Sequence, residues 1–316
     1  MEKKTVSEID FIKLIAAIFV VFGHIRFPGT FGECIFNLAQ FAVPVFFMLA
    51  GYFTVLSSPF GKYVKRIKKL VVMFLIASVV YLALGLISGS EEINKILSVK
   101  GVLRFLLLND AEFIKYHLWF LPALIYTYLF VYLLYRLLGD KIYWLILSLV
   151  IFWPVAYSIW SFFTGSKINY VLYRNFLFDG IPFFLLGNLI KKHEERIAEK
   201  LRLSILLPAL AAAVAVQVLL TILQVIFTEV GFGIISIIVF LICVYFKNNP
   251  SGCRIRISPD ISLFVYLVHP LFITVVKRLL PTLSNWIAPI VVALLSVTCA
   301  YVYSMGKRKI KLKTRN

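Results

Sequence analysis

The stretch that decides the fold is IDFIKLIAAIFVVFGHIRF, which occupies residues 9 to 27. A helix needs about 20 mostly apolar residues to cross the hydrocarbon core of a bilayer. This run has that length, although Asp10, Lys13 and His24 interrupt it. Because of these interruptions, and because no small-residue cleavage site follows Phe27, the run does not match a cleaved signal peptide. We expect it to remain as the first membrane helix.

The composition extends this interpretation to the whole chain. Of its 316 residues, 61% are hydrophobic and 15% are charged, whereas a soluble domain has about a quarter charged residues. The sequence predicts an all-α, polytopic integral membrane protein, a single transmembrane domain over residues 1–316 with no fused soluble domain. About ten spans are expected, near residues 9–27, 36–56, 70–88, 117–137, 142–162, 174–190, 203–223, 228–246, 260–279 and 286–306. Residues 89 to 116 are expected to hold an amphipathic helix at the membrane interface.

The distribution of basic residues predicts the orientation. The termini and alternate loops on one side carry 23 Lys and Arg, against nine on the other side, and positive charge accumulates in cytoplasmic loops. Both termini are therefore expected in the cytoplasm, in a multi-pass protein of a cell membrane, most simply the bacterial plasma membrane. The net charge of +18 is then explained by basic residues in the cytoplasmic loops, and no nucleic-acid partner is expected. The C-terminal KRKIKLKTRN, residues 307 to 316, predicts an anchor on anionic lipid headgroups.

The cysteines give no sign of a metal site. Cys34, Cys243, Cys253 and Cys299 lie far apart, with no CxxC or Cys/His ligand spacing, so neither a metal nor a disulfide framework is expected.

Three polar residues of the first span share one face. At 100° per residue, Asp10, Lys13 and His24 fall within a stripe about 60° wide, and Lys13 and His24 lie roughly 16 Å apart along the helix. Arg26 points away from it and suits an interfacial anchor. Ionisable groups inside a membrane span are costly and mark candidate functional sites. The alternative is structural, with an i,i+3 pair between Asp10 and Lys13 and a histidine packed within the protein.

The same segment resembles a known family. IDFIKLIAAIFVVFGH is similar to the first helix of the acyltransferase 3 family, membrane O-acyltransferases that modify surface polysaccharides and related glycans. In that family ten residues separate a basic residue from a histidine, here Lys13 and His24. Similar family segments follow in order: VPVFFMLAGYF (43–53), YVKRIKKL (63–70), HLWFLPALI (117–125), PFFLLGNLI (182–190) and YLVHPLFI (266–273). Two positions depart from the family, which usually has arginine at Lys13 and serine at Ala50. A lysine cannot offer arginine's planar fork.

The resemblance implies transfer of an acyl group, with acetyl the simplest, from cytoplasmic acyl-CoA to a hydroxyl of a cell-envelope saccharide. His24 would act as general base or form an acyl-histidine intermediate, and Lys13 would line the path of the pantetheine arm. No permanently bound cofactor is expected, since acyl-CoA, most simply acetyl-CoA, is a substrate. The expected partners are membrane lipid, a glycan or lipid-linked saccharide acceptor, and proteins of polysaccharide biosynthesis.

Other residues receive secondary roles. Arg66 and Lys69, with Asp10, are candidates for binding the acyl-CoA donor, because cationic side chains suit its phosphates. Ordinary positive-inside anchoring explains the two basic residues equally well. His117 and Trp119 are candidates for contact with the acceptor, although an aromatic belt at the interface also accounts for Trp119. His269, next to Pro270, is a second candidate that orients substrate or acts with His24.

Two other functions fit the same features. A transporter or flippase for a lipid-linked sugar or a small solute would use the polar stripe as a pathway, although no related halves of the kind common in such proteins are visible. A noncatalytic scaffold would have no need of the stripe.

Overall fold

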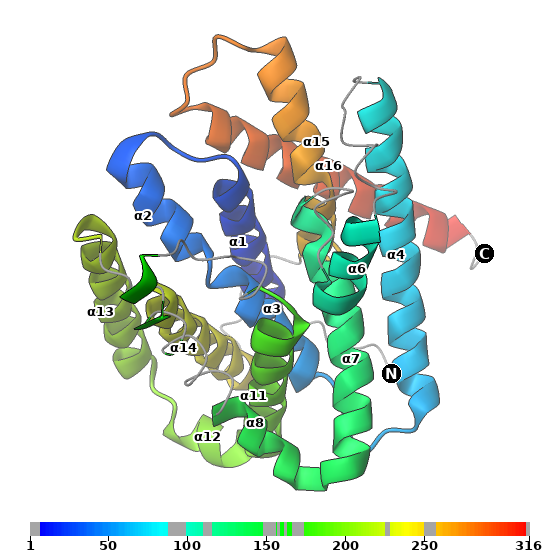
Figure 1. Ribbon diagram of the computed structural model, residues 1–316, viewed down its shortest axis with the longest axis vertical. Coiled ribbons are helices and arrows are strands. Elements are labelled where there is room, and N and C mark those ends of the chain that lie inside the picture. The colour runs from blue at the N-terminus through cyan, green and yellow to red at the C-terminus, as the bar shows by residue number, and fades with distance from the viewer. Residues whose placement is uncertain are drawn as a thin grey trace. The chain divides into compact units, whose positions relative to one another are not determined.

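The computed structural model describes residues 7–87, 99–109, 116–147, 156, 159–160, 163–165, 174–224, 228–249 and 257–313 (Figure 1). Within these ranges the secondary structure is helical and contains no strand, which confirms the predicted all-α class. The chain divides into two compact units. The first comprises Met1–Phe46 and Glu194–Asn316, and the second comprises Phe47–His193.

The first unit is organised around its N-terminal helix. Its elements are α1 (Ser7–His24), α2 (Gly29–Ala39), α12 (Glu194–Lys200), α13 (Leu203–Ile222), α14 (Thr228–Asn248), α15 (Ile261–Leu279) and α16 (Ala288–Lys313). Helix α1 packs against α2, α14, α15 and α16. Ala17 and Val21 of α1, with Ile25 just after the helix, belong to a buried core with side chains of α15 and α16, such as Val265 and Val292. The polar first helix is thus an internal element of this unit.

Helix α1 ends earlier than expected. Its last residue is His24, whereas the sequence predicted a span to residue 27. Pro28 disfavours helical geometry at the residue before it, and Gly29 has a positive φ of +61°, which glycine adopts without strain. The chain therefore turns directly after His24 and leaves this side chain at the end of the helix.

The second unit contains a long helix and a bundle of shorter ones. Its elements are α4 (Phe60–Ile87), α6 (Val99–Leu108), the 3-10 helix η1 (Tyr116–Trp119), α7 (Phe120–Leu138), the 3-10 helix η2 (Gly139–Tyr143), α8 (Trp144–Leu147), the π-helix η4 (Phe176–Gly180) and α11 (Ile181–Lys192). Helix α3 (Ala42–Tyr52) starts in the first unit and ends in the second. Helix α4 packs on α7, and α11 packs on η4, α8 and α7.

Glycines allow α3 and α11 to touch. A Cβ on Gly51 would lie 1.8 Å from the carbonyl oxygen of Phe184, and one on Gly187 would lie 2.0 Å from that of Met48. Asn188 completes this contact by donating to the carbonyls of Gly51 (3.1 Å) and Thr54 (2.6 Å). Carbonyls at a helix end have no partner within the helix, so Asn188 satisfies the end of α3.

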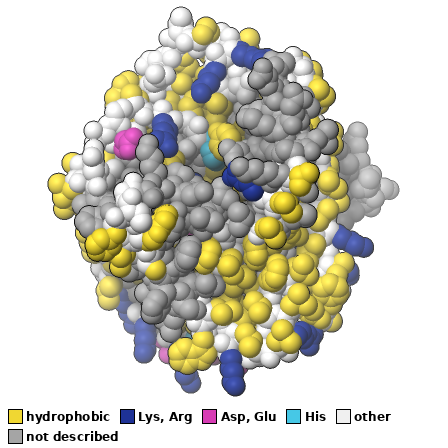
Figure 2. All heavy atoms as spheres, viewed as in Figure 1, with side chains coloured by type: hydrophobic (Ala, Val, Ile, Leu, Met, Phe, Trp, Pro, Cys, Tyr) yellow, Lys and Arg dark blue, Asp and Glu magenta, His cyan; other side chains and the backbone are white. Residues whose placement is uncertain are grey.

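Seven segments of the described chain are long and apolar enough to cross a membrane. They are Gly29–Tyr52, Phe60–Ile87, Tyr116–Ile146, Leu203–Ile222, Gly231–Asn248, Ile261–Leu279 and Ala288–Lys307. Figure 2 shows an apolar surface in the region of α4 and α7. Val72, Ile76 and Val79 of α4 are exposed, which suits contact with lipid. The chain is therefore a membrane protein with several spans. The count of ten and the orientation of the termini stay predictions.

Some predicted boundaries were wrong. Helix α4 begins at Phe60, so the basic residues between positions 62 and 69 are helical and do not form the loop that we expected before residue 70. Lys and Arg are good helix formers, and Pro59 precedes the first turn, where proline is tolerated. The span expected over 36–56 begins at Gly29 and is interrupted between α2 and α3. Helix α6 lies within the expected interfacial segment, and most of the span predicted over 142–162 lies outside the described residues.

Candidate functional site

The polar face of α1 contains an ion pair near its start. Lys13 Nζ lies 2.8 Å from Asp10 Oδ1, and the two side chains are 21% and 6% exposed. Asp10 lies in the first turn, where a carboxylate also interacts favourably with the helix dipole. The pair carries no net charge, so Asp10 lowers the cost of holding the Lys13 ammonium within the protein.

At the other end of α1, two histidines meet. The ring of His24 stacks on that of His269 from α15, with centroids 5.0 Å apart and planes inclined by 17°. His269 is completely buried, whereas His24 is only partly buried. The structure thus places in contact two residues for which the sequence offered a joint role as one alternative. Only His24 of the two has a surface that a second molecule can reach.

The hydrogen bond of His269 defines its tautomer. His269 Nδ1 lies 3.3 Å from the carbonyl oxygen of Val265, one turn earlier on α15. A carbonyl oxygen can only accept, so Nδ1 carries the hydrogen and the lone pair of a neutral ring lies on Nε2. This bond and Pro270, which follows in the helix, hold the ring in place beside His24.

Arg66 is engaged within the second unit. Its guanidinium donates to Thr54 Oγ1 (2.9 Å), the Tyr128 hydroxyl (3.2 Å) and the carbonyl of Phe53 (2.6 Å). These bonds tie the segment after α3 to α4 and α7, and they use three of the five donors of the guanidinium. Arg66 therefore has a clear structural role, which the positive-inside pattern alone did not indicate.

Lys69 lies one turn further along α4, on the same side as Arg66. Its side chain is exposed. Of the two basic residues predicted to bind the donor, Lys69 is therefore the more accessible.

His117 and Trp119 lie in η1, at the start of the helical segment that continues as α7. His117 is 1% exposed, and the ring of Tyr81 from α4 packs edge-on against it at 4.9 Å. Trp119 is partly buried. Both residues belong to the second unit, whereas His24 and His269 belong to the first.

The sequence interpretation missed a buried polar turn before α11. Asn175 Oδ1 accepts from the backbone N–H groups of Leu177 and Phe178, and Asn109 Oδ1 accepts from that of Phe176. The turn is the π-helix η4, which contains the buried Asp179. π-Helical turns are frequent at functional sites. Asn175 before an apolar run was the available signal, because asparagine commonly caps helices.

The chain is similar to known proteins over nearly all of its length. Residues 6–305 match the family described as acyltransferase domain, Acyl_transf_3. An amino-acid racemase from Enterococcus faecalis is 26% identical, in an alignment that covers 99% of this chain and 47% of that protein. A serine/alanine racemase from Enterococcus gallinarum is 31% identical over 60% of this chain and 29% of that protein. No solved structure matches the chain significantly.

This chain therefore spans less than half the length of the curated relatives that it matches, and their names describe the longer proteins. The family match covers both units, including the helix with Lys13 and His24 and the helix with His269. The protein is a member of the acyltransferase 3 family.

Proposed function

We propose that the protein transfers an acyl group, most simply acetyl, from cytoplasmic acyl-CoA to a hydroxyl of a cell-envelope saccharide. The observation that carries this proposal is the stacked pair of His24 and His269, in a membrane protein of an acyltransferase family. An imidazole that changes charge near neutral pH is suited to accept the proton of a hydroxyl. His24 is the partly exposed member of the pair, and we assign it the role of general base.

In the proposed reaction the acceptor oxygen attacks the carbonyl carbon of the thioester. The C–O bond forms, the C–S bond breaks, and His24 takes the proton of the hydroxyl. The His24 imidazolium then returns this proton to the sulfur of the departing CoA, so the enzyme ends in its starting state. No cofactor other than the donor substrate enters this sequence.

The neighbouring residues support this role in different ways. His269 is fully buried and cannot touch the saccharide, so it acts as a positioning residue through its stacked ring. Lys13, paired with Asp10, gives the inner part of α1 a polar face without net charge. This face suits the polar amide groups of the pantetheine arm.

The remaining candidate residues divide between the two substrates. The exposed ammonium of Lys69 contributes positive charge for the CoA phosphates, and Arg66 stabilises the start of α4 and offers its remaining donors. Trp119, which is partly buried, is proposed to stack on the sugar of the acceptor. The buried His117 is proposed to support this side without touching the sugar. The acceptor is a glycan or a lipid-linked saccharide, and association with polysaccharide biosynthesis proteins would supply it.

The names of the racemase relatives do not suit the histidine pair. A two-base racemisation removes a proton from one face of a carbon and adds one to the other, so its two bases must flank the substrate. His24 and His269 stack directly on each other and leave no space for a substrate between their rings.

The test is acyl transfer by purified protein in proteoliposomes supplied with radiolabelled acetyl-CoA and an envelope-glycan fraction. We expect wild type to release CoA and to label the glycan. His24→Ala should lower turnover roughly 100-fold or more, the range of general base catalysis, with unchanged binding of acetyl-CoA. His193→Ala is the matched control, because His193 is exposed and lies at the end of α11.

Two results would contradict the proposal. Equal turnover in wild type and His24→Ala would remove His24 from the chemical step. Movement of unmodified saccharide across the vesicle membrane, without CoA and without a mass change, would identify a transporter or flippase.

A further inference from the structure

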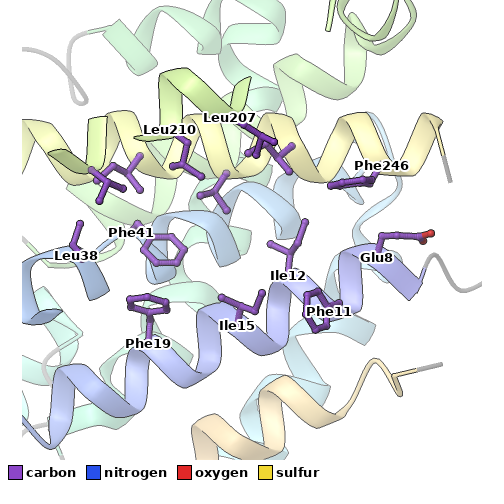
Figure 3. A pocket seen from close by; sticks show the side chains of 14 residues that line it. Glu8, Phe11, Ile12, Ile15, Phe19, Leu38, Phe41, Leu207, Leu210 and Phe246 are labelled. Carbon is purple, nitrogen blue, oxygen red and sulfur yellow. The ribbon is translucent and has the colours of Figure 1, made fainter. Parts of the chain in front are cut away.

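Helix α1 has a second face that the proposed reaction does not use. Glu8, Phe11, Ile12, Ile15 and Phe19 line a cavity of about 600 Å³, a volume typical of ligand sites. On the helical wheel these residues centre roughly 170° from the stripe of Asp10, Lys13 and His24. Figure 3 shows Ile12, Ile15 and Phe19 directed toward α13 and α14, across from Leu210. The cavity and the polar face therefore lie on opposite sides of α1.

The walls of this cavity are apolar. Side chains of α2, α13 and α14 face α1 across it, among them Leu38, Leu210 and Val239. Three of these walls belong to segments that can cross a membrane. At the edge of the cavity, Phe11 and Leu207 are 49% and 50% exposed. In a bilayer the medium outside such side chains is hydrocarbon, so the cavity opens to lipid.

The two ends of the cavity differ. Among the described residues that line it, Glu8 alone is charged, and it lies at the same end as Phe246 (Figure 3). Toward the other end, Val214 is followed one turn later on α13 by the buried Gln217. A Cβ on Gly231 would lie 1.7 Å from Gln217 Oε1, so this side chain fills the gap between α13 and α14.

A second polar contact lies just beyond Gln217. Asn37 Nδ2 of α2 donates to Thr221 Oγ1 of α13 at 3.1 Å. The lining of the cavity therefore has a carboxylate at one end, and at the other end it is apolar, with polar side chains of α2 and α13 next to it in the sequence. The α1 residues between Glu8 and Phe19 extend over roughly 16 Å. A space of this form fits one linear hydrocarbon chain of limited length, with its polar headgroup at the Glu8 end.

We infer that this cavity binds one acyl chain of a zwitterionic membrane phospholipid. The acyl chain of the CoA donor does not fit, because its thioester would be at His24, on the opposite face of α1. An anionic headgroup is disfavoured beside the carboxylate of Glu8. Lipid tails are as apolar as the lining, so moving a tail from the bilayer into the cavity gains no hydrophobic free energy. Binding is driven by van der Waals contacts, because the lining side chains of an empty cavity have no partner atoms on that side.

The experiment uses wild-type protein in phosphatidylcholine vesicles that contain a trace of phosphatidylcholine with a diazirine on one acyl chain. After illumination, the labelled residues are mapped by peptide mass spectrometry. We expect adducts to be concentrated on the lining residues of α13 and α14. Leu210→Trp, which fills the cavity, should reduce these adducts several-fold. Leu219→Trp is the matched control, because Leu219 is on the same helix and 54% exposed.

Val239→Phe fills the cavity from α14 and replaces Leu210→Trp if that variant does not fold. Labelling that is spread evenly over exposed apolar residues, or that neither filling variant reduces, would overturn the inference. Complete displacement of the label by a polyprenyl phosphate would overturn the assignment to phospholipid. The assay contains no CoA, so its outcome is independent of the proposed acyl transfer.

Discussion

The contact between His24 and His269 limits what each histidine can do. A buried ring can act only through its neighbour, whereas the partly exposed ring of His24 can meet a hydroxyl. Two positive charges on rings 5.0 Å apart would repel each other strongly in a medium of low dielectric constant. The pair therefore favours a single positive charge. When His24 accepts a proton, this repulsion favours a neutral His269, whose Nδ1–H still donates to the carbonyl of Val265.

This arrangement predicts the behaviour of two substitutions at His269. His269→Ala removes the stacked ring and frees His24 to rotate, and small misplacement of a catalytic group can cost about 100-fold in rate. We expect kcat to fall by that order while the Kd for acetyl-CoA is unchanged. His269→Phe keeps an aromatic ring for stacking and should retain more activity than His269→Ala. Steady-state kinetics with a binding isotherm distinguish these outcomes.

The comparison needs a stability control, because either change alters a buried side chain. Thermal unfolding of both variants shows whether the loss of rate follows the loss of stability. If the kcat of His269→Ala equals that of the wild type, the stacked ring does not position His24. Equal loss of kcat in both variants, with equally lowered Tm, would show that His269 serves only the packing of α15.

The sequence could predict which residues share a face of α1, because helical periodicity places Asp10, Lys13 and His24 together. It could also offer the Asp10–Lys13 pair, since i,i+3 neighbours meet on a helix. The stacking of His24 on His269 depends on how α1 packs against α15, and local periodicity does not contain that information. The same holds for the bonds of Arg66 to Thr54 and Tyr128.

Among the helices, the crossing of α3 and α11 depends on glycine. The backbones approach so closely at Gly51 and Gly187 that a single added carbon would collide with a carbonyl oxygen. Asn188, next to Gly187, can reach the carbonyls at the end of α3 because of this approach. Its own side-chain oxygen accepts from the Tyr143 hydroxyl at 2.7 Å. The crossing therefore joins three parts of the second unit.

We predict opposite effects for alanine at two helical glycines. Gly187→Ala should destabilise the protein by about 1–3 kcal/mol or more, the usual cost of overpacking, because its Cβ would lie 2.0 Å from the Met48 oxygen. Gly61→Ala in α4 should stabilise it by up to about 1 kcal/mol, since nothing lies within 4 Å of that position. Thermal unfolding in detergent measures both effects. Equal Tm values for the two variants would refute the close crossing.

The limits of sequence interpretation are visible at the helix ends. Apolar runs located the long helices, but α4 starts ten residues before its apolar run at position 70, since basic residues with long side chains continue a helix readily. The π-turn of η4 was not predicted, because its capping partner Asn109 comes from a distant part of the chain. Helix boundaries that depend on capping and packing cannot be predicted from the hydropathy of the sequence.

For the whole molecule, the number of spans decides on which sides of the membrane the two ends lie. Seven segments qualify by length and apolarity, and a total of ten requires three more. Helix α1 carries Glu8, Asp10 and Lys13 in its 18 residues and is not among the seven. The ten-span prediction counts it as a span, and its packing against α2, α14, α15 and α16 supports that count. The π-helix η4 and α11 contribute 5 and 12 successive residues, which is near the minimum of about 17 for crossing. The third is the segment predicted over 142–162.

An even number of spans places both termini on one side, and the excess of Lys and Arg predicts that this side is the cytoplasm. We expect a green fluorescent protein fused after Asn316 to be fluorescent and a tag before Met1 to resist protease added outside intact cells. Alkaline phosphatase fused at the same C-terminal position should be inactive, because it folds only outside the cytoplasm. Termini on opposite sides would exclude ten spans. Both termini outside would keep an even count but reverse the orientation, and the Lys69 side of α4 would then face away from the cytoplasmic pool of acyl-CoA.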